Sequence, residues 1–293
     1  MCMAKLEFTH LGKVFFPKVS FTKGDLIEYY QSVADVMLPY LKDRPHSLLR
    51  QPDGISGESF FQKNIEKPPA WVKTIKLHAE STGEDVHYLV GRDLDTLLYM
   101  VQLGCIEINP WNSRVGCLDK PDWAVIDLDP EAVGFDKVVE AALVVKAACD
   151  ELQIPTYPKT SGKTGIHIYI PLSAKYNYNQ TKGFAQALAN LVHERVPDFT
   201  SVVRMPKKRK GKVYLDFLQN RQGQTLAAPY SIRPTEVASV STPLHWDEVN
   251  KRLDPFKFTI KTIHKRLAKV GDLWKPVLGK GVNIKQILKQ IGG

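Results

Sequence analysis

The segment PDWAVIDLDPE, from Pro121 to Glu131, decides the fold and much of the chemistry of this 293-residue chain. Its apolar run AVIDLD has the length and composition of a buried β-strand, and we expect Pro130 to end that strand. Side chains alternate between the two faces of a strand, so Asp127 and Asp129 project from one face and Leu128 from the other. The segment therefore predicts a sheet with one acidic face and one apolar face.

Two carboxylates at the end of one strand repel each other, and a divalent cation would remove that repulsion. Mg²⁺ and Mn²⁺ favour oxygen ligands and accept one or two carboxylates together with substrate phosphates. An Asp-Pro pair is also common where a strand simply enters a turn. Asp127 and Asp129 by themselves thus leave both interpretations open.

A second segment, KTSGKTGIHIYIPL, spans residues 159–172. The small residues from Ser161 to Gly165 predict a turn whose backbone N–H groups and hydroxyl can approach phosphate oxygens closely. His167 follows on the polar face of a strand and can donate a hydrogen bond to the same phosphates. The turn lacks the spacing of a Walker A loop and leads into a strand instead of a helix. A glycine hairpin beside an ordinary half-buried histidine is the alternative.

A third segment, GKVYLDFLQN, spans residues 211–220 and places Asp216 inside an apolar strand. We expect Tyr214, Asp216 and Leu218 on one face of this strand. A buried carboxylate needs a cation or a hydrogen-bonding partner. Asp216 therefore either completes a metal site with the first two aspartates or pairs with a nearby Lys or Arg.

The remaining pattern alternates strands with helices and predicts an α/β or α+β fold. We expect helices over residues 22–41, 135–152 and 180–195, the first with a capping-box-like start at Thr22 and Asp25. We expect strands within 115–129 and over 165–172 and 212–218, and broken helices from residue 244 onward. The chain contains no internal repeat and no low-complexity tract.

Composition indicates a soluble globular protein, with 43% hydrophobic and 24% charged residues. No apolar run is long enough for a membrane span, and the N-terminus does not resemble a secretory signal. Four scattered cysteines lack metal-ligand spacing and predict reduced thiols in a cytosolic protein.

The net charge of +9 is concentrated at the C-terminal end of the chain. Residues 251–293 contain eleven Lys/Arg and two Asp/Glu, whereas the preceding 250 residues contain 29 of each sign and balance. A second basic run, RMPKKRKGK, spans residues 204–212. Such clusters are typical of proteins that bind polyanions, although a solvated basic face is the alternative.

Together these segments resemble the archaeo-eukaryotic primase superfamily and, closely, the polymerase domain of bacterial DNA ligase D. The resemblance covers essentially the whole chain and includes GKVFFP, TKGDLIEYY, FFQKN, IEINPWNSR, APYSIRP and DPFKFTIKTIHKRLAKVGDLW. It implies an α+β fold with mostly antiparallel central sheets and an RRM-like catalytic core flanked by helices. It also implies that residues 1–293 form a single domain, with residues 244–293 as a basic helical segment that packs on the domain or extends from it.

The resemblance also implies roles for particular residues. Asp127, Asp129 and Asp216 fall on the positions that bind two catalytic Mn²⁺ or Mg²⁺ ions. The positions that contact the incoming nucleotide are Ser161, Gly165, His167, Gln219, Arg233 and, with a weaker match, Arg209. The positions that contact DNA are Lys13 and Lys23 at a 5′-phosphate, Phe60 and Phe61 stacked on bases, Lys63, and Asn109. At position 109 many members of the family carry histidine, which leaves the role of Asn109 open.

The function implied is a gap-filling polymerase of non-homologous end joining that extends 3′-hydroxyl ends and accepts or prefers ribonucleotides. The implied partners are DNA with 5′-phosphate ends or gaps, nucleoside triphosphates, a Ku-like end-binding protein and an ATP-dependent DNA ligase. We expect a cytoplasmic, nucleoid-associated monomer, either free-standing or as one domain of a larger ligase. Three alternatives remain: a replicative primase that makes primers de novo, a metal-dependent nuclease, and a non-catalytic nucleic-acid binding module.

Overall fold

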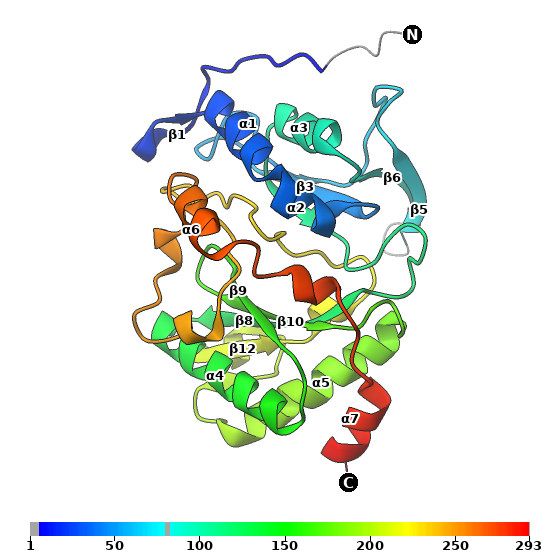
Figure 1. Cartoon of the computed structure of the whole chain (residues 1–293), viewed down its shortest axis with the longest axis vertical. Coiled ribbons are helices and arrows are strands. Elements are labelled where there is room, and N and C mark those ends of the chain that lie inside the picture. Colours follow the sequence, from blue (N-terminus) through cyan, green and yellow to red (C-terminus); the bar gives the residue numbers. More distant parts are fainter. Residues whose placement is uncertain (1–5, 80–82, 293) are drawn as a thin grey trace.

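Two mostly antiparallel sheets organise the computed structural model, which describes residues 6–79 and 83–292 (Figure 1). The sheet that carries the three aspartates, here called the catalytic sheet, has the strand order β11-β12-β8-β10-β9. Only the β11–β12 pairing is parallel. Its strands are β8 (Trp123–Glu131), β9 (Tyr157–Thr160), β10 (Ile166–Pro171), β11 (Thr200–Ser201) and β12 (Lys212–Asp216).

The second sheet has the order β4-β3-β6-β5, with β7 also paired to β3. Its strands are β3 (Pro45–Arg50), β4 (Phe60–Gln62), β5 (Thr74–Ala79), β6 (Glu84–Val90) and β7 (Cys105–Pro110). A short hairpin of β1 (Val14–Phe16) and β2 (Phe21–Thr22) precedes it. The helices are α1 (Lys23–Ser32), α2 (Ala34–Leu41), α3 (Leu94–Gln102), α4 (Phe135–Glu151), α5 (Tyr178–Arg195), α6 (Ile263–Val270) and α7 (Ile284–Ile291).

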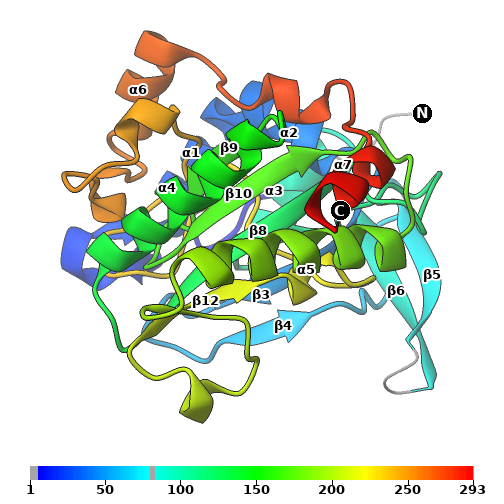
Figure 2. The ribbon, with the colours of Figure 1, turned by 90° about the horizontal axis from the view of Figure 1, so that it is seen from below.

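Helices α4 and α5 lie along one face of the catalytic sheet (Figure 2). The alternating apolar residues of the three central strands all enter this core, with Ile126, Ile168 and Leu215 at most 1% exposed. Full burial of each such side chain stabilises the fold by about 1.5–3 kcal/mol. This packing fixes which side chains of the same strands must face the other way.

The other core lies between the catalytic sheet, the second sheet and helices α1 to α3. The basic C-terminal segment contributes to both cores instead of extending into solvent. Ile263 of α6 and Trp274 belong to the core beside α1, whereas Ile284 and Ile287 of α7 belong to the core beneath α5. The segment therefore folds onto the protein, with its apolar residues inward.

The expectation that Pro130 ends the central strand is wrong, because β8 continues to Glu131. The β8–β10 pairing ends at Leu128, and beyond it β8 pairs only with β12, where Val213 lies opposite Pro130. Beyond Leu128 the strand is thus an edge on its β10 side, and a proline is tolerated in an edge strand because no ladder donor is missed there.

Two further expectations need correction. Residues 22–41 form two helices, because the backbone leaves the helical conformation at Val33, which is both the C-cap of α1 and the N-cap of α2. Leu218 does not share a face with Asp216, because the strand gives way to a 3₁₀ turn and Leu218 packs against the apolar core. The capping box of Thr22 and Asp25 is confirmed.

Cys105, Cys117 and Cys149 are free thiols, as expected, and Cys2 lies outside the described residues. Across residues 6–79 and 83–292, no helix combines the length and apolar character needed to cross a bilayer.

Candidate active site

Four side chains form a row across the charged face of the catalytic sheet. Asp127 lies in β8, with His167 of β10 opposite it on one side and Asp216 of β12 opposite it on the other. Lys159 of β9 lies opposite His167 and ends the row. The strand register therefore brings together residues that are up to 89 positions apart in the chain.

Asp127, Asp129 and Asp216 each place a carboxylate oxygen within 4.8 Å of the others. Asp127 is only 3% exposed, and burial raises its pKa well above the ordinary value of 3.8, with the charges of Asp129 and Asp216 adding to the effect. Burial, followed by the charge of Asp216, also raises the pKa of Asp129. Carboxylates crowded in this way are stabilised by a divalent cation.

Asp127 has a buried oxygen, Oδ1, that accepts no hydrogen bond from the described residues. The nearest cation-forming atom is His167 Nε2 at 3.3 Å, but burial, followed by the charge of Lys159, lowers the pKa of His167 well below its ordinary value. A neutral imidazole cannot balance the carboxylate. An unsatisfied buried oxygen among three acidic groups fits a metal ligand.

Asp216 is held by three donors. It accepts hydrogen bonds from the Tyr214 hydroxyl at 3.2 Å, the Leu218 amide at 2.7 Å and Gln219 Nε2 at 3.2 Å. Among the residues that the structure describes, it forms no ion pair with Lys or Arg, so that alternative is not supported. The 3₁₀ turn after β12 thus brings Gln219 to the edge of the acidic cluster.

The Ser161–Gly165 turn lies directly beside the carboxylates. The Ser161 hydroxyl oxygen accepts hydrogen bonds from the amides of Lys163 at 3.1 Å and Gly165 at 3.0 Å. A Cβ atom at Gly165 would lie 2.7 Å from the Leu128 carbonyl and 3.4 Å from an Asp129 carboxylate oxygen. Only glycine therefore lets the turn approach the acidic strand this closely.

Arg233 joins this turn to the second sheet. Its guanidinium donates to the Ser161 carbonyl and forms an ion pair with Glu107 at 2.7 Å. Both side chains are largely buried, so the pair holds the guanidinium firmly. Arg209 approaches from the other side, stacked 3.9 Å above the Tyr214 ring, with Nε 3.7 Å from a Glu131 carboxylate oxygen. Its buried Nε and Nη1 atoms form no hydrogen bond with the described residues.

Two residues of this site were not predicted from the sequence. Glu107 holds Arg233, and Lys159 is fully buried with its ammonium donating to the Ser241 hydroxyl at 2.5 Å. Burial, followed by the charge of Arg233, lowers the pKa of Lys159 well below its ordinary value. No pattern within a single strand relates Lys159 to His167, because the two residues lie in different strands and only the register of β9 against β10 brings them together.

The family model for the LigD primase-polymerase domain matches residues 22–274. This chain belongs to that family. It is 38% identical over 270 residues to the "Bifunctional non-homologous end joining protein LigD" of Bacillus subtilis, covering 91% of this chain and 43% of that protein. It is 31% identical over 292 residues to the "Multifunctional non-homologous end joining protein LigD" of Pseudomonas aeruginosa, covering 98% of this chain and 34% of that protein.

Among solved structures, one match is the "Polymerase Domain from Mycobacterium tuberculosis Ligase D in complex with DNA". The TM-score is 0.85 at 26% identity, covering 94% of this chain and 99% of that one. The expected fold class is therefore confirmed. As a LigD primase-polymerase domain, the chain is a nucleotidyltransferase, and it spans less than half the length of the LigD proteins of B. subtilis and P. aeruginosa.

All the positions predicted to contact DNA in this LigD polymerase domain, except Asn109, fall into two groups. Lys13 and Lys23 lie together, joined by a backbone hydrogen bond of 2.8 Å, and Lys13 forms an ion pair with Asp53. Lys23 is only 5% exposed and donates to the Thr9 carbonyl at 3.0 Å. Lys13 is thus the more accessible of the two cations.

The second group lies on the edge strand β4 and just beyond it. Phe60 and Phe61 are 37% and 59% exposed, which is unusual for large apolar side chains, and Lys63 is exposed nearby. Asn109, in contrast, is 3% exposed and donates to the carbonyl of Glu107 at 3.3 Å. Asn109 therefore lies inside the second sheet and not on the surface near Phe60.

Proposed function

We propose that residues 1–293 act as a single template-dependent polymerase domain that extends 3′-hydroxyl ends and fills gaps at DNA double-strand breaks. The observation that carries this proposal is the three-carboxylate cluster beside the Ser161–Gly165 turn, which approaches Leu128 and Asp129 too closely for a side chain at Gly165. A site with both features suits a nucleoside triphosphate held against divalent metal.

In this proposal Asp127, Asp129 and Asp216 hold two Mn²⁺ or Mg²⁺ ions. Bound there, the metals would make the primer 3′-hydroxyl a better nucleophile and neutralise charge on the triphosphate and the leaving pyrophosphate. The raised pKa of Asp127 and the unpartnered Oδ1 atom support this assignment.

The chain's own residues position the nucleotide. The Ser161 hydroxyl, braced by two backbone amides, has its proton available to donate to a phosphate oxygen. Arg233, fixed by Glu107, offers further guanidinium donors, and Arg209 supplies a second cation. His167, opposite Asp127 in the sheet, would donate one hydrogen bond to a phosphate oxygen, while Gln219 donates to Asp216.

The alternatives fit these contacts less well. A nuclease would need the acidic cluster but not the braced Ser161 turn and the clamped Arg233, which suit a triphosphate. A non-catalytic binding module leaves the buried, unneutralised Asp127 unexplained. A replicative primase would use the same site and would differ in its substrate, a single-stranded template without a primer.

We further propose that the substrate is a DNA end or gap with a 5′-phosphate, held at Lys13 and Lys23, with Phe60 and Phe61 stacking on template bases. Ribonucleotides would be accepted, and a Ku-like end binder and an ATP-dependent ligase would be the partners. The names of the B. subtilis and P. aeruginosa relatives and the DNA bound to the M. tuberculosis domain support this substrate class.

The test is extension of a primer across a gapped duplex with a recessed 5′-phosphate, in Mn²⁺, with ribo- or deoxynucleotides. We expect template-matched extension, and its loss in Asp127→Ala/Asp129→Ala. No extension by the wild type, or equal extension by the double variant, would contradict the proposal. Primer synthesis on single-stranded template without a primer would favour the replicative alternative.

The 5′-phosphate anchor has a separate test. Lys13→Ala should reduce the advantage of gaps that carry a 5′-phosphate over gaps that do not, while leaving extension of an open primer-template intact. An unchanged advantage would remove Lys13 from the anchor without affecting the catalytic assignment.

A further inference from the structure

The basic C-terminal segment has a charged surface that the catalytic proposal does not use. Its apolar residues Ile260, Ile263 and Trp274 are buried in the core beside α1. Arg266 is largely buried and pairs with Glu248, but the lysines of this stretch face outward. Lys251, Arg252, Lys257, Lys261, Lys265 and Lys269 are all exposed, and none forms an ion pair with any residue that the structure describes.

These cations lie beside the hairpin that carries the proposed 5′-phosphate anchor. The Lys261 ammonium lies 4.8 Å from the ring centre of Phe21. Phe21 precedes Lys23 by two positions in the sequence. Helix α6 packs on α1 through His264, whose Nε2 is 3.3 Å from the Ser32 hydroxyl. Figures 1 and 2 both show α6 next to α1.

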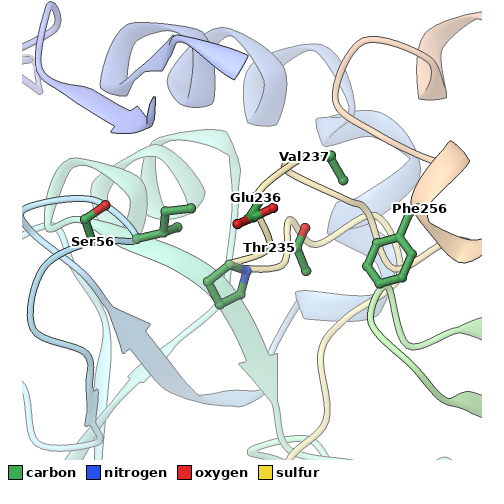
Figure 3. Close-up of a pocket in the computed structure, with 7 residues that line it drawn as sticks. Ser56, Thr235, Glu236, Val237 and Phe256 are labelled. Atoms are coloured by element: carbon green, nitrogen blue, oxygen red, sulfur yellow. The ribbon is translucent and has the colours of Figure 1, made fainter. Parts of the chain in front are cut away.

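A pocket of about 700 Å³ lies between the loop that follows Asp53 and Phe256 of the basic segment (Figure 3). One side is formed by Ile55 and Ser56, which follow Asp53, the partner of Lys13. Phe256, 43% exposed, lines the other side and directly precedes Lys257. The pocket's one carboxylate, Glu236, is neutralised by Lys18 at 2.6 Å.

We propose that Phe256, Lys257, Lys261 and Lys265, here called the downstream shelf, bind the DNA duplex that continues beyond the 5′-phosphate. This inference rests on the proposed function, because it extends the anchor at Lys13. A strand held by its 5′-phosphate runs away from the break, and its phosphates require cations continuous with that anchor. The shelf supplies unpaired lysines at this place, next to a pocket with an apolar wall.

The chemistry of the shelf favours a duplex over a single strand. Proteins that track single strands present repeated aromatic platforms for successive bases, whereas the shelf has one exposed aromatic ring and several cations. Binding by phosphate neutralisation alone is salt-dependent and independent of sequence, as needed at breaks of any sequence. Phe256 then offers an apolar surface to the first downstream nucleotide.

The experiment compares two triple variants of equal charge change. Lys257→Gln/Lys261→Gln/Lys265→Gln removes three shelf cations, including the Lys261 ammonium near the Phe21 ring, and leaves a polar side chain at each position. Lys280→Gln/Lys285→Gln/Lys289→Gln removes three exposed lysines of the same segment near α7, on a different part of the surface (Figure 1). Each full-length protein is titrated against a gapped duplex with a 5′-phosphate and against the same primer-template without its downstream strand, over a range of salt.

We expect the shelf variant to bind the gapped duplex about tenfold more weakly. The slope of log affinity against log salt concentration should be smaller by about 0.9 for each DNA phosphate that the variant no longer neutralises. Its affinity for the open primer-template should be unchanged, and the α7 variant should match the wild type on both substrates. Phe256→Ala should weaken binding of the gapped duplex in the same selective way.

The proposal would be overturned if both triple variants lost affinity for the gapped duplex equally, or if the shelf variant lost affinity equally for both DNAs. It would also be overturned if the shelf variant lost no affinity. Primer extension by the wild type, measured in parallel, separates this outcome from failure of the proposed function. If the wild type extends primers but the shelf variant binds normally, only the shelf is wrong. Thermal unfolding of each variant checks that its fold is retained.

Discussion

The two faces of the catalytic sheet are made by the same strands and have opposite physical characters. On one face every central residue is apolar and packs against α4 and α5. On the other, Lys159, His167, Asp127 and Asp216 lie in one row, and all but Asp216 are nearly inaccessible to solvent. Ile126 therefore stabilises the fold, whereas the adjacent Asp127 destabilises it.

Packing of the apolar face stabilises the fold and thereby holds the charged groups of the other face close together. Crowded carboxylates oppose folding, as the raised pKa values of Asp127 and Asp129 indicate. A tightly packed core resists the relaxation that would separate these groups. Substitutions on the charged face should consequently reduce activity, and substitutions on the apolar face should reduce stability.

The largest effect is expected for Asp127→Asn. Loss of a metal-holding carboxylate should reduce the rate of nucleotide addition about a thousandfold, since such metals contribute several kcal/mol. The free energy of unfolding in EDTA should not fall, because one of three repelling charges is removed. A variant that is inactive and also markedly less stable without metal would contradict the division between the faces.

The neighbouring substitution Ile126→Ala should have the opposite result. It removes buried apolar volume against α4 and α5 and should lower the free energy of unfolding by about 2–5 kcal/mol in urea titrations. Well below the unfolding transition, the rate of nucleotide addition should stay within a few-fold of the wild type. A thousandfold loss of activity in a folded Ile126→Ala protein would show that the two faces are not separable.

A smaller effect is expected for Arg233→Lys. Lysine cannot both pair with Glu107 and donate to the Ser161 turn, so the KM for the nucleotide should rise about tenfold to a hundredfold. Arg195→Lys is the matched control, because Arg195 forms an exposed pair with Glu151 at the end of α5. An unchanged nucleotide KM in Arg233→Lys would remove Arg233 from the nucleotide site.

The smallest effect concerns pH and metal. The pKa values of Asp127 and Asp129 are raised above 3.8 in the folded protein, so above that pH the metal-free fold binds more protons than the unfolded chain. Its free energy of unfolding should therefore fall as pH rises from about 4, by about 1.4 kcal/mol per unit of raised pKa at most.

Mn²⁺ should reverse this loss, because it binds the ionised carboxylates of the folded state. Unfolding by urea at several pH values, in EDTA and in Mn²⁺, measures both effects. Asp127→Asn should show a weaker pH dependence and little stabilisation by Mn²⁺. A metal-free wild type that becomes more stable over the same pH range would contradict the sign of the pKa shifts.

The sequence by itself determined the faces of the strands. Strand alternation put Asp127 and Asp129 opposite Leu128, and the motifs identified a family that residues 22–274 match. Local signals also predicted the capping box at Thr22. These features depend on neighbours in the chain and on side-chain geometry that any strand or helix must obey.

Only the tertiary structure decided which residues meet. Strand register placed Asp216 beside Asp127 and put Lys159 in the same row. Pro130 remains in strand β8 because the pairing of β8 with β10 ends before it, at Leu128. Long-range packing joined Glu107 to Arg233 and folded the basic C-terminal segment against α1. Such contacts depend on the pairing and packing of distant segments, which no local pattern specifies.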